Sequence, residues 1–220
     1  MKVYRLTGAA PLCENTYLLA KEGKALIVDP GVSAESILSV CKNASLEPIA
    51  VLLTHGHADH ILGARGLQKA GIKVYAHREE FDLISSRKNL ALALGVTLEP
   101  LVPDVALADE DKPDLSPFDV MVLATPGHTA GGVSYLVDGA LFSGDTLFAG
   151  SYGRTDFPTG DEQDLLCSIA NVLFELPKET PVFAGHGLLS YAEEGTLPPL
   201  AEPDTTIGEE YYTNPILNLL

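Results

Sequence analysis

The chain has 220 residues, and 46% of them are hydrophobic, which is enough for the core of one large domain. Thirty acidic residues against fourteen basic ones give a formal net charge of −16, which argues against binding to nucleic acid or to an anionic membrane surface. The first residues lack the apolar core of a secretion signal, and no apolar stretch is long enough to cross a membrane, so we expect a soluble, cytoplasmic protein.

The N-terminal half of the chain alternates short apolar strands with helical patterns. Runs rich in Val, Ile, Leu and Tyr predict strands at residues 2–6, 15–20, 25–28, 49–53 and 74–76. Ser33 is the predicted N-cap of a helix that ends near Ala44 and carries Ile37 and Cys41 on its inward face. Helices are also predicted at residues 62–70, before Gly71, and at residues 78–95.

The C-terminal half begins with residues 100–117, which are rich in Pro and Asp and predict an exposed excursion. Strands are predicted at residues 120–124, 134–137, 140–142 and 181–184, and Asp138-Gly139 predicts a tight hairpin between the second and third of them. Asp161 is a predicted N-cap, and the apolar residues that follow it at helical spacing predict a helix that ends before Pro177. From Gly187 onward the chain shows little periodicity, which predicts loops.

One stretch directly after the strand at residues 49–53 concentrates side chains of the types that bind metals. Residues 54–60 (THGHADH) contain three imidazoles and one carboxylate within six positions. His and Asp are preferred ligands of zinc and similar ions. A regular helix would bring His57 and His60 to one face but would turn His55 and Asp59 elsewhere. The spacing therefore favours a tight loop, in which Gly56 allows the turn.

Three more residues of ligand type follow predicted strands in the same way. His128 lies in PGHT, Asp145 in SGDT and His186 in GHG. Taken singly, each of them is equally compatible with a polar residue of a turn. Sites at the carboxyl ends of strands are, however, where folds built on sheets commonly hold ligands. Together with residues 54–60, these three side chains predict a metal site.

The order of these motifs, HxHxDH, PGHT, SGDT and GHG, resembles the metallo-β-lactamase superfamily, and residues 29–31 (DPG) also match a motif of that family. The resemblance runs from about residue 2 to residue 187. It implies an α/β (α+β) fold, a four-layer αββα sandwich in which two mixed sheets are flanked by helices. We expect residues 1–220 to form a single domain of this type, with residues 187–220 as a C-terminal tail in place of a separate helical substrate domain.

The resemblance also implies which residues bind metal. Two divalent ions would be held by His55, His57 and His128 at the first site and by Asp59, His60 and His186 at the second, with Asp145 bridging the two. Asp29 would orient a ligand imidazole through its other nitrogen. Zinc is the expected ion, and iron and manganese are alternatives because imidazole and carboxylate suit all three.

Residues 153–158 (GRTDFP) resemble the glyoxalase II-like branch of the superfamily. This resemblance implies that a hydroxide activated by the two ions attacks a thioester carbonyl, as in hydroxyacylglutathione hydrolases, with Asp59 and Asp145 in the catalytic centre. The persulfide dioxygenases, which bind a single iron, share a similar stretch and are one alternative. A lactonase or another ester hydrolase of the superfamily is a second alternative.

The expected substrate is a small thioester or ester, and Arg154 is the candidate residue to contact it. The last basic residue of the chain is Lys178, so the tail supplies no cation. Glutathione carries two carboxylates, and an acidic tail cannot give them charge-assisted hydrogen bonds. An ion pair between Arg154 and Asp156 is an equally good interpretation of the arginine.

Overall fold

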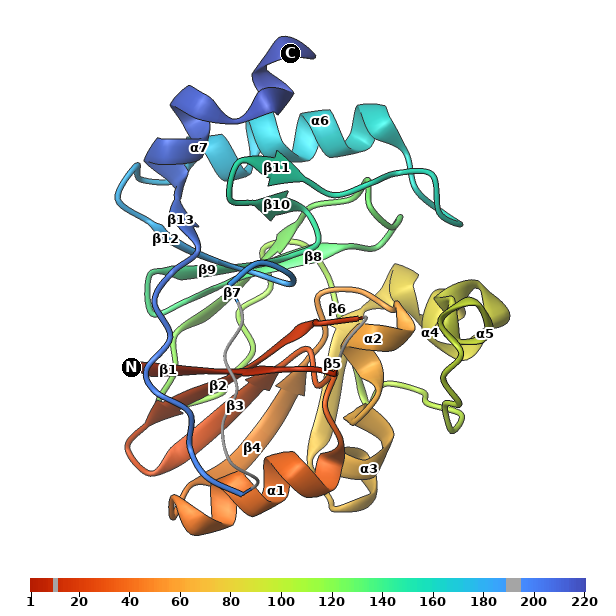
Figure 1. The fold of residues 1–220 in the computed structure, drawn as a ribbon, viewed down its shortest axis with the longest axis vertical. Helices are drawn as coiled ribbons and strands as arrows, with labels where there is room; N and C mark the ends of the chain where they lie inside the picture. Colours follow the sequence, from red (N-terminus) through yellow and green to blue (C-terminus); the bar gives the residue numbers. More distant parts are fainter. Residues whose placement is uncertain (10–11, 189–194) are drawn as a thin grey trace.

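Two β-sheets pack face to face in the computed structural model, which describes residues 1–9, 12–188 and 195–220 (Figure 1). Within these residues the first sheet holds six strands in chain order. They are β1 (Lys2–Thr7), β2 (Asn15–Lys21), β3 (Lys24–Val28), β4 (Glu47–Leu52), β5 (Lys73–His77) and β6 (Val105–Leu107). The pairs from β1 to β3 are antiparallel and those from β3 to β6 are parallel, so the sheet is mixed, as predicted.

The second sheet has the strand order β13-β12-β9-β8-β7 within the described residues. Its strands are β7 (Val120–Ala124), β8 (Val133–Val137), β9 (Ala140–Gly144), β12 (Pro181–Ala184) and β13 (Thr205–Thr206), and a small ribbon of β10 (Leu147–Phe148) and β11 (Ser151–Tyr152) lies beside it. β8 runs antiparallel between β7 and β9, and β12 is parallel to β9. The carboxyl ends of β7, β9 and β12 therefore meet at one edge of the sheet.

Three apolar layers hold the sheets and helices together. The inner faces of the sheets meet through side chains such as Leu52 of the first and Phe142 of the second. The outer face of the first sheet packs against α1 (Ala34–Asn43) and α3 (Ala64–Lys69). The outer face of the second packs against α6 (Glu162–Asn171) and α7 (Ile207–Thr213). The order helix, sheet, sheet, helix in Figure 1 confirms the predicted four-layer sandwich.

Local sequence signals correctly predicted several element boundaries. Ser33 caps α1 by accepting a hydrogen bond from the backbone nitrogen of Ser36 at 3.2 Å, and Asp161 caps α6 in the same way. Asp138 and Gly139 join β8 to β9 with φ values of 48° and 83°. Both values lie in the left-handed region that a two-residue hairpin turn requires.

The helix predicted at residues 78–95 is wrong as a continuous element. The segment consists of short pieces: η1 (Arg78–Glu80), α4 (Phe81–Ser85), η2 (Arg87–Asn89) and α5 (Ala91–Leu94). Ser86 is extended, and Leu90 is left-handed with a φ of 66°. The side chain of Asn89 stabilises these interruptions. It donates a hydrogen bond to the carbonyl of Ile84 and accepts one from the backbone nitrogen of Ala91. Such bonds compete with regular helix, and apolar spacing alone does not reveal them.

Two regions predicted without regular structure also contain some. β6 lies inside the excursion at residues 100–117, where its three residues are too few to stand out among Pro and Asp. In the tail, β13, α7 and the turn η4 (Pro215–Asn218) contradict the prediction of loops. Thr206 and Glu209 form a capping box at the start of α7, and that signal is visible in the sequence. A single domain over residues 1–220 stays a prediction.

Among the helices formed by the described residues, none combines the length and the apolarity needed to cross a bilayer.

A small helix, α2 (Ala58–Ile61), follows β4 at the sheet edge.

Candidate metal centre

The loop after β4 presents its four ligand-type side chains from a turn and a single helical turn. His55 lies in the turn, and His57 is the N-cap of α2, which contains Asp59 and His60. The turn is packed so closely that a Cβ on Gly56 would lie 2.8 Å from a side-chain carbon of Ile84. The turn predicted after β4 is present at His55 and Gly56, but Asp59 and His60 lie in a helical turn, and Gly56 is needed for close packing rather than for a left-handed backbone.

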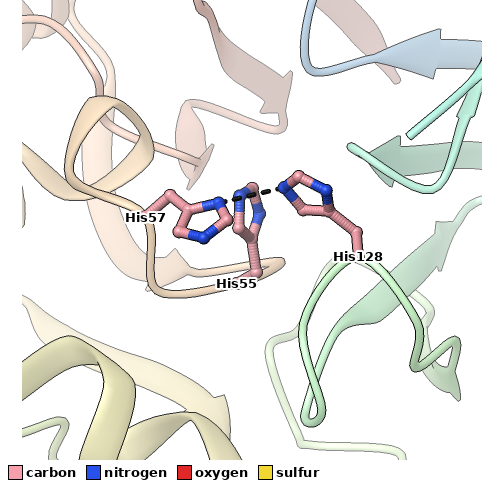
Figure 2. A group of neighbouring side chains, drawn as sticks. All are labelled: His55, His57 and His128. Carbon is pink, nitrogen blue, oxygen red and sulfur yellow. Dashed lines mark hydrogen bonds between the residues drawn. The ribbon is translucent and has the colours of Figure 1, made fainter. Parts of the chain in front are cut away.

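Six of the seven predicted ligands form two compact groups. In each group, one ligand atom per residue lies within 4.8 Å of those of the others. The first group is His55, His57 and His128, and the second is Asp59, His60 and His186. Figure 2 shows the three rings of the first group turned toward one another, with His57 Nδ1 2.9 Å from His128 Nε2.

Asp145 lies between the two groups. Its carboxylate oxygens are 3.4 Å from His60 Nε2, 3.6 Å from His128 Nε2 and 3.6 Å from His186 Nε2. One carboxylate thus contacts a histidine of the first group and two of the second. That is the position from which a carboxylate can bind two ions at once.

Asp29 lies behind the ligand side chains rather than among their metal-facing atoms. Its carboxylate accepts hydrogen bonds from the backbone nitrogen and the hydroxyl of Thr54 at 2.7 and 2.6 Å. The same carboxylate lies 3.0 Å from His60 Nδ1, which leaves Nε2 of that ring facing Asp145. A bond of this kind fixes the tautomer and the orientation of a ligand imidazole.

Burial and neighbouring charges set the protonation of the cluster. Desolvation lowers the pKa of His57 to about 3 and holds the pKa of His55 well below its usual value. Burial opposes charge on His60, but the carboxylates of Asp145, Asp59 and Asp29 together outweigh it and raise the pKa of that ring. Burial would raise the pKa of Asp145, yet the neighbouring histidines, His60 first among them, together lower it well below the usual range. His55 and His57 are therefore neutral near pH 7, which is the form of histidine that binds metal.

The donor set fits divalent ions. His55 Nε2, His60 Nε2 and Asp145 Oδ1 are buried without a hydrogen-bond partner among the described residues. Buried polar atoms are rarely left unpaired, because each one costs the free energy of its lost hydration. Cations placed within the two groups would satisfy donors of this kind.

A cavity of about 380 Å³ opens beside both groups. Its lining includes the apolar residues Leu90, Leu94, Phe148 and Phe157, and candidate metal ligands such as Asp59. The cavity is thus lined by both apolar side chains and candidate metal ligands.

Arg154 also lines this cavity, but its guanidinium has a partner. It donates two hydrogen bonds of 2.6 Å to Asp156 and lies over the ring of Phe157, 4.1 Å from its centroid. The backbone carbonyl of the same residue lies 2.7 Å from His128 Nδ1. Both interpretations of Arg154 thus have a structural basis, and its backbone contributes a contact that the sequence did not suggest.

Two carboxylates beside the site were missed in the sequence. Glu80 binds the backbone of the two loops that carry the first group. Asp204, in the C-terminal segment, accepts hydrogen bonds from the backbone nitrogens of Ala184 and Leu188, on either side of His186. Neither residue belongs to a motif, so no local signal marks it.

Comparison with known proteins matches this geometry to one family. The model of the metallo-beta-lactamase superfamily matches residues 11–186. The hydroxyacylglutathione hydrolase GloC of Haemophilus influenzae is 35% identical over 203 residues, which cover 90% of this chain and 89% of that protein. Among solved structures, the BLEG-1 B3 metallo-beta-lactamase gives a TM-score of 0.82 at 36% identity, with 98% of each chain covered. TTHA1623 in a di-iron-bound form gives 0.80 at 33% identity, with 96% of this chain and 98% of that chain covered.

Proposed function

This chain belongs to the metallo-beta-lactamase superfamily, and from that premise we propose that it is a dinuclear metal-dependent hydrolase of thioesters, similar to hydroxyacylglutathione hydrolases. The observation that carries the proposal is the pair of three-residue groups with Asp145 between them. The similarity to GloC supports a thioester as the substrate class. The expected ions are zinc, although the di-iron form of TTHA1623 supports iron as an alternative.

Two divalent ions in these groups would bring the pKa of bound water toward neutrality and polarise a substrate carbonyl. The residues of the chain prepare that chemistry. Asp145 fixes the separation of the two groups, and Asp59, which lines the cavity and lies 3.5 Å from His186 Nε2, orients the attacking water. Leu90 and Leu94 pack against the acyl group and exclude bulk water, which strengthens the electrostatic interactions inside.

The thiol carrier that this cavity suits is smaller or less anionic than glutathione. Arg154 is the one Lys or Arg among the described residues that line it, and its guanidinium is already paired with Asp156. Two glutathione carboxylates would therefore find no unpaired cation there. We expect hydrolysis of glutathione thioesters with a high KM, and comparable or better activity on thioesters of a neutral thiol.

Three other activities compete with this proposal. A persulfide dioxygenase with one iron needs only part of the cluster, whereas two complete groups favour two ions. The similarity to BLEG-1 supports β-lactam hydrolysis as a competing reaction. A lactonase would use the same ions on an ester carbonyl.

Steady-state kinetics on a panel of substrates tests the proposal. The panel contains one acyl group on glutathione and on N-acetylcysteamine, a lactone and a β-lactam, with oxygen uptake measured on glutathione persulfide. We expect the highest kcat/KM for a thioester, its loss after chelation and its return with zinc. A higher kcat/KM for the lactone or the β-lactam, or oxygen uptake with persulfide, would replace the proposal by the matching alternative.

A further inference from the structure

Glu80 is a buried carboxylate, outside the seven candidate ligands, that contacts both loops of the first histidine group. The residue is 1% exposed and ends η1, directly after β5. Its Oε2 accepts a hydrogen bond from the backbone nitrogen of Gly56 at 2.7 Å, and its Oε1 accepts one from that of Gly131 at 2.8 Å. Gly56 separates His55 from His57, and Gly131 follows His128 by three positions.

The two glycines permit this contact by the absence of a side chain. A Cβ on Gly56 would lie 2.8 Å from Ile84 Cγ1 and 3.1 Å from Glu80 Oε2. A Cβ on Gly131 would lie 2.8 Å from the backbone nitrogen of Glu80. Neither glycine has a φ in the left-handed region, so a turn conformation does not explain them. Close approach to the segment that carries Glu80 is the feature that excludes a side chain at both positions.

The carboxylate is held by these amides rather than by a cation. Among the described residues, no Lys or Arg lies within ion-pair distance of Glu80, and burial raises its pKa. A buried carboxylate without a cation is costly, and charge-assisted bonds from two amides offset part of that cost. The remaining cost lowers the stability of the fold, and the contact that results joins two loops 75 residues apart, from Gly56 to Gly131.

From this geometry we infer that Glu80 is a positioning residue of the first metal group, because it fixes the loop of His55 and His57 against the loop of His128. With both loops tied to one carboxylate, the three rings are held close together, and Figure 2 shows His57 and His128 facing each other beside His55. The inference rests on the proposed function for its assignment of metal ligands, and not for its substrate.

Zinc titration in two single-site backgrounds tests this role. His186→Ala removes a ligand of the second group and leaves the first, whereas His57→Ala does the reverse. Glu80→Gln is made in each background, because its amide keeps the shape of the side chain but turns one acceptor into a donor that faces a backbone N–H. Glu79→Gln is the matched control, since it makes the same change at the neighbouring, exposed position. Zinc affinity is measured with a competing chelator, and the melting temperature of each metal-free variant is recorded.

We expect Glu80→Gln to weaken zinc binding by roughly ten- to a hundredfold in the His186→Ala background, as loss of a bond that orients a ligand does. The His57→Ala background and both Glu79→Gln variants should change less than about twofold, within the scatter of surface substitutions. Unchanged affinity at the first group, or an equal loss at both groups that follows the melting temperature, would overturn the inference.

A second variant guards against misfolding. If Glu80→Gln is insoluble, Glu80→Asp is used, because it keeps the charge but is one methylene too short to reach both amides. The same selective loss of zinc affinity at the first group is expected. Zinc affinity equal to that of the background protein would again contradict the role. Failure of both backgrounds to bind zinc would refute the ligand assignment and this inference with it. Zinc titration uses no substrate, so a protein that binds zinc as expected but leaves thioesters intact would refute only the proposed activity.

Discussion

The carboxylate of Asp145 lies within 3.6 Å of histidines from both candidate metal groups. Asp145→Asn keeps the shape of the side chain but removes the negative charge that two cations would share. We expect kcat/KM to fall by more than about a hundredfold and at least one ion to bind more weakly. Asp59→Asn, which alters only the second group, should retain the first ion. Near-normal turnover and full metal content in Asp145→Asn would refute the assignment.

Substitution of Arg154 tests whether its side chain binds the thiol carrier of the substrate. Because its guanidinium is already engaged by Asp156, Arg154→Ala should leave kcat/KM for a neutral thioester nearly unchanged. The ratio of kcat/KM for the glutathione thioester to kcat/KM for the neutral one should not fall either. The measurement is kcat/KM for one acyl group on glutathione and on N-acetylcysteamine. A clear preference for the glutathione substrate that Arg154→Ala abolishes would show that this arginine binds the carrier.

The residues that face the candidate ions could be predicted from the sequence, whereas those that support them could not. His55, His128 and His186 each stand beside a glycine after a predicted strand, so each can be recognised from its neighbours in the sequence. Glu80 acts on Gly56 from 24 positions away, and its role depends on how β5 returns the chain to the metal loop. A contact between loops that are distant in sequence leaves no local pattern.

At the scale of elements, apolar spacing correctly predicted most strands and the helices α1 and α6, because each buries one face against a sheet. It failed for residues 78–95, where Leu90 and Leu94 line a cavity instead of packing in a core. A segment shaped by a cavity has no reason to keep helical periodicity. Failure of the simple pattern at this point is consistent with a functional role of the segment.

The C-terminal segment is tied to the second metal group through Asp204. Its carboxylate binds Arg5 at 2.6 Å, with both side chains at most 3% exposed, and accepts hydrogen bonds from Ala184 and Leu188 on either side of His186. Asp204→Asn leaves the buried arginine without its ionic partner, so we expect the free energy of unfolding to fall by about 3–5 kcal/mol. Zinc binding at the second group should weaken as well.

Denaturant unfolding and zinc titration measure these two effects. Glu202→Gln, at an exposed position of the same segment, is the control and should leave both unchanged. An Asp204→Asn protein with the stability and second-site affinity of the parent would show that the segment only covers the sheet.

At the scale of the whole molecule, metal should contribute to stability. Without cations, the carboxylates of Asp59 and Asp145 repel each other at the junction of the two sheets. Ions that bind only the folded form stabilise it by mass action. We therefore expect a lower melting temperature after chelation and its recovery when zinc is added. An identical melting curve for verified metal-free protein would exclude this contribution.

Metal content per chain tests the central claim most directly. Two groups of three candidate ligands with Asp145 between them could hold two ions, which is what the proposed function needs. Elemental analysis of protein produced with zinc and iron both available should give two metal ions per chain, with zinc as the expected ion. One iron per chain with no second site would contradict the dinuclear hydrolase and favour the dioxygenase.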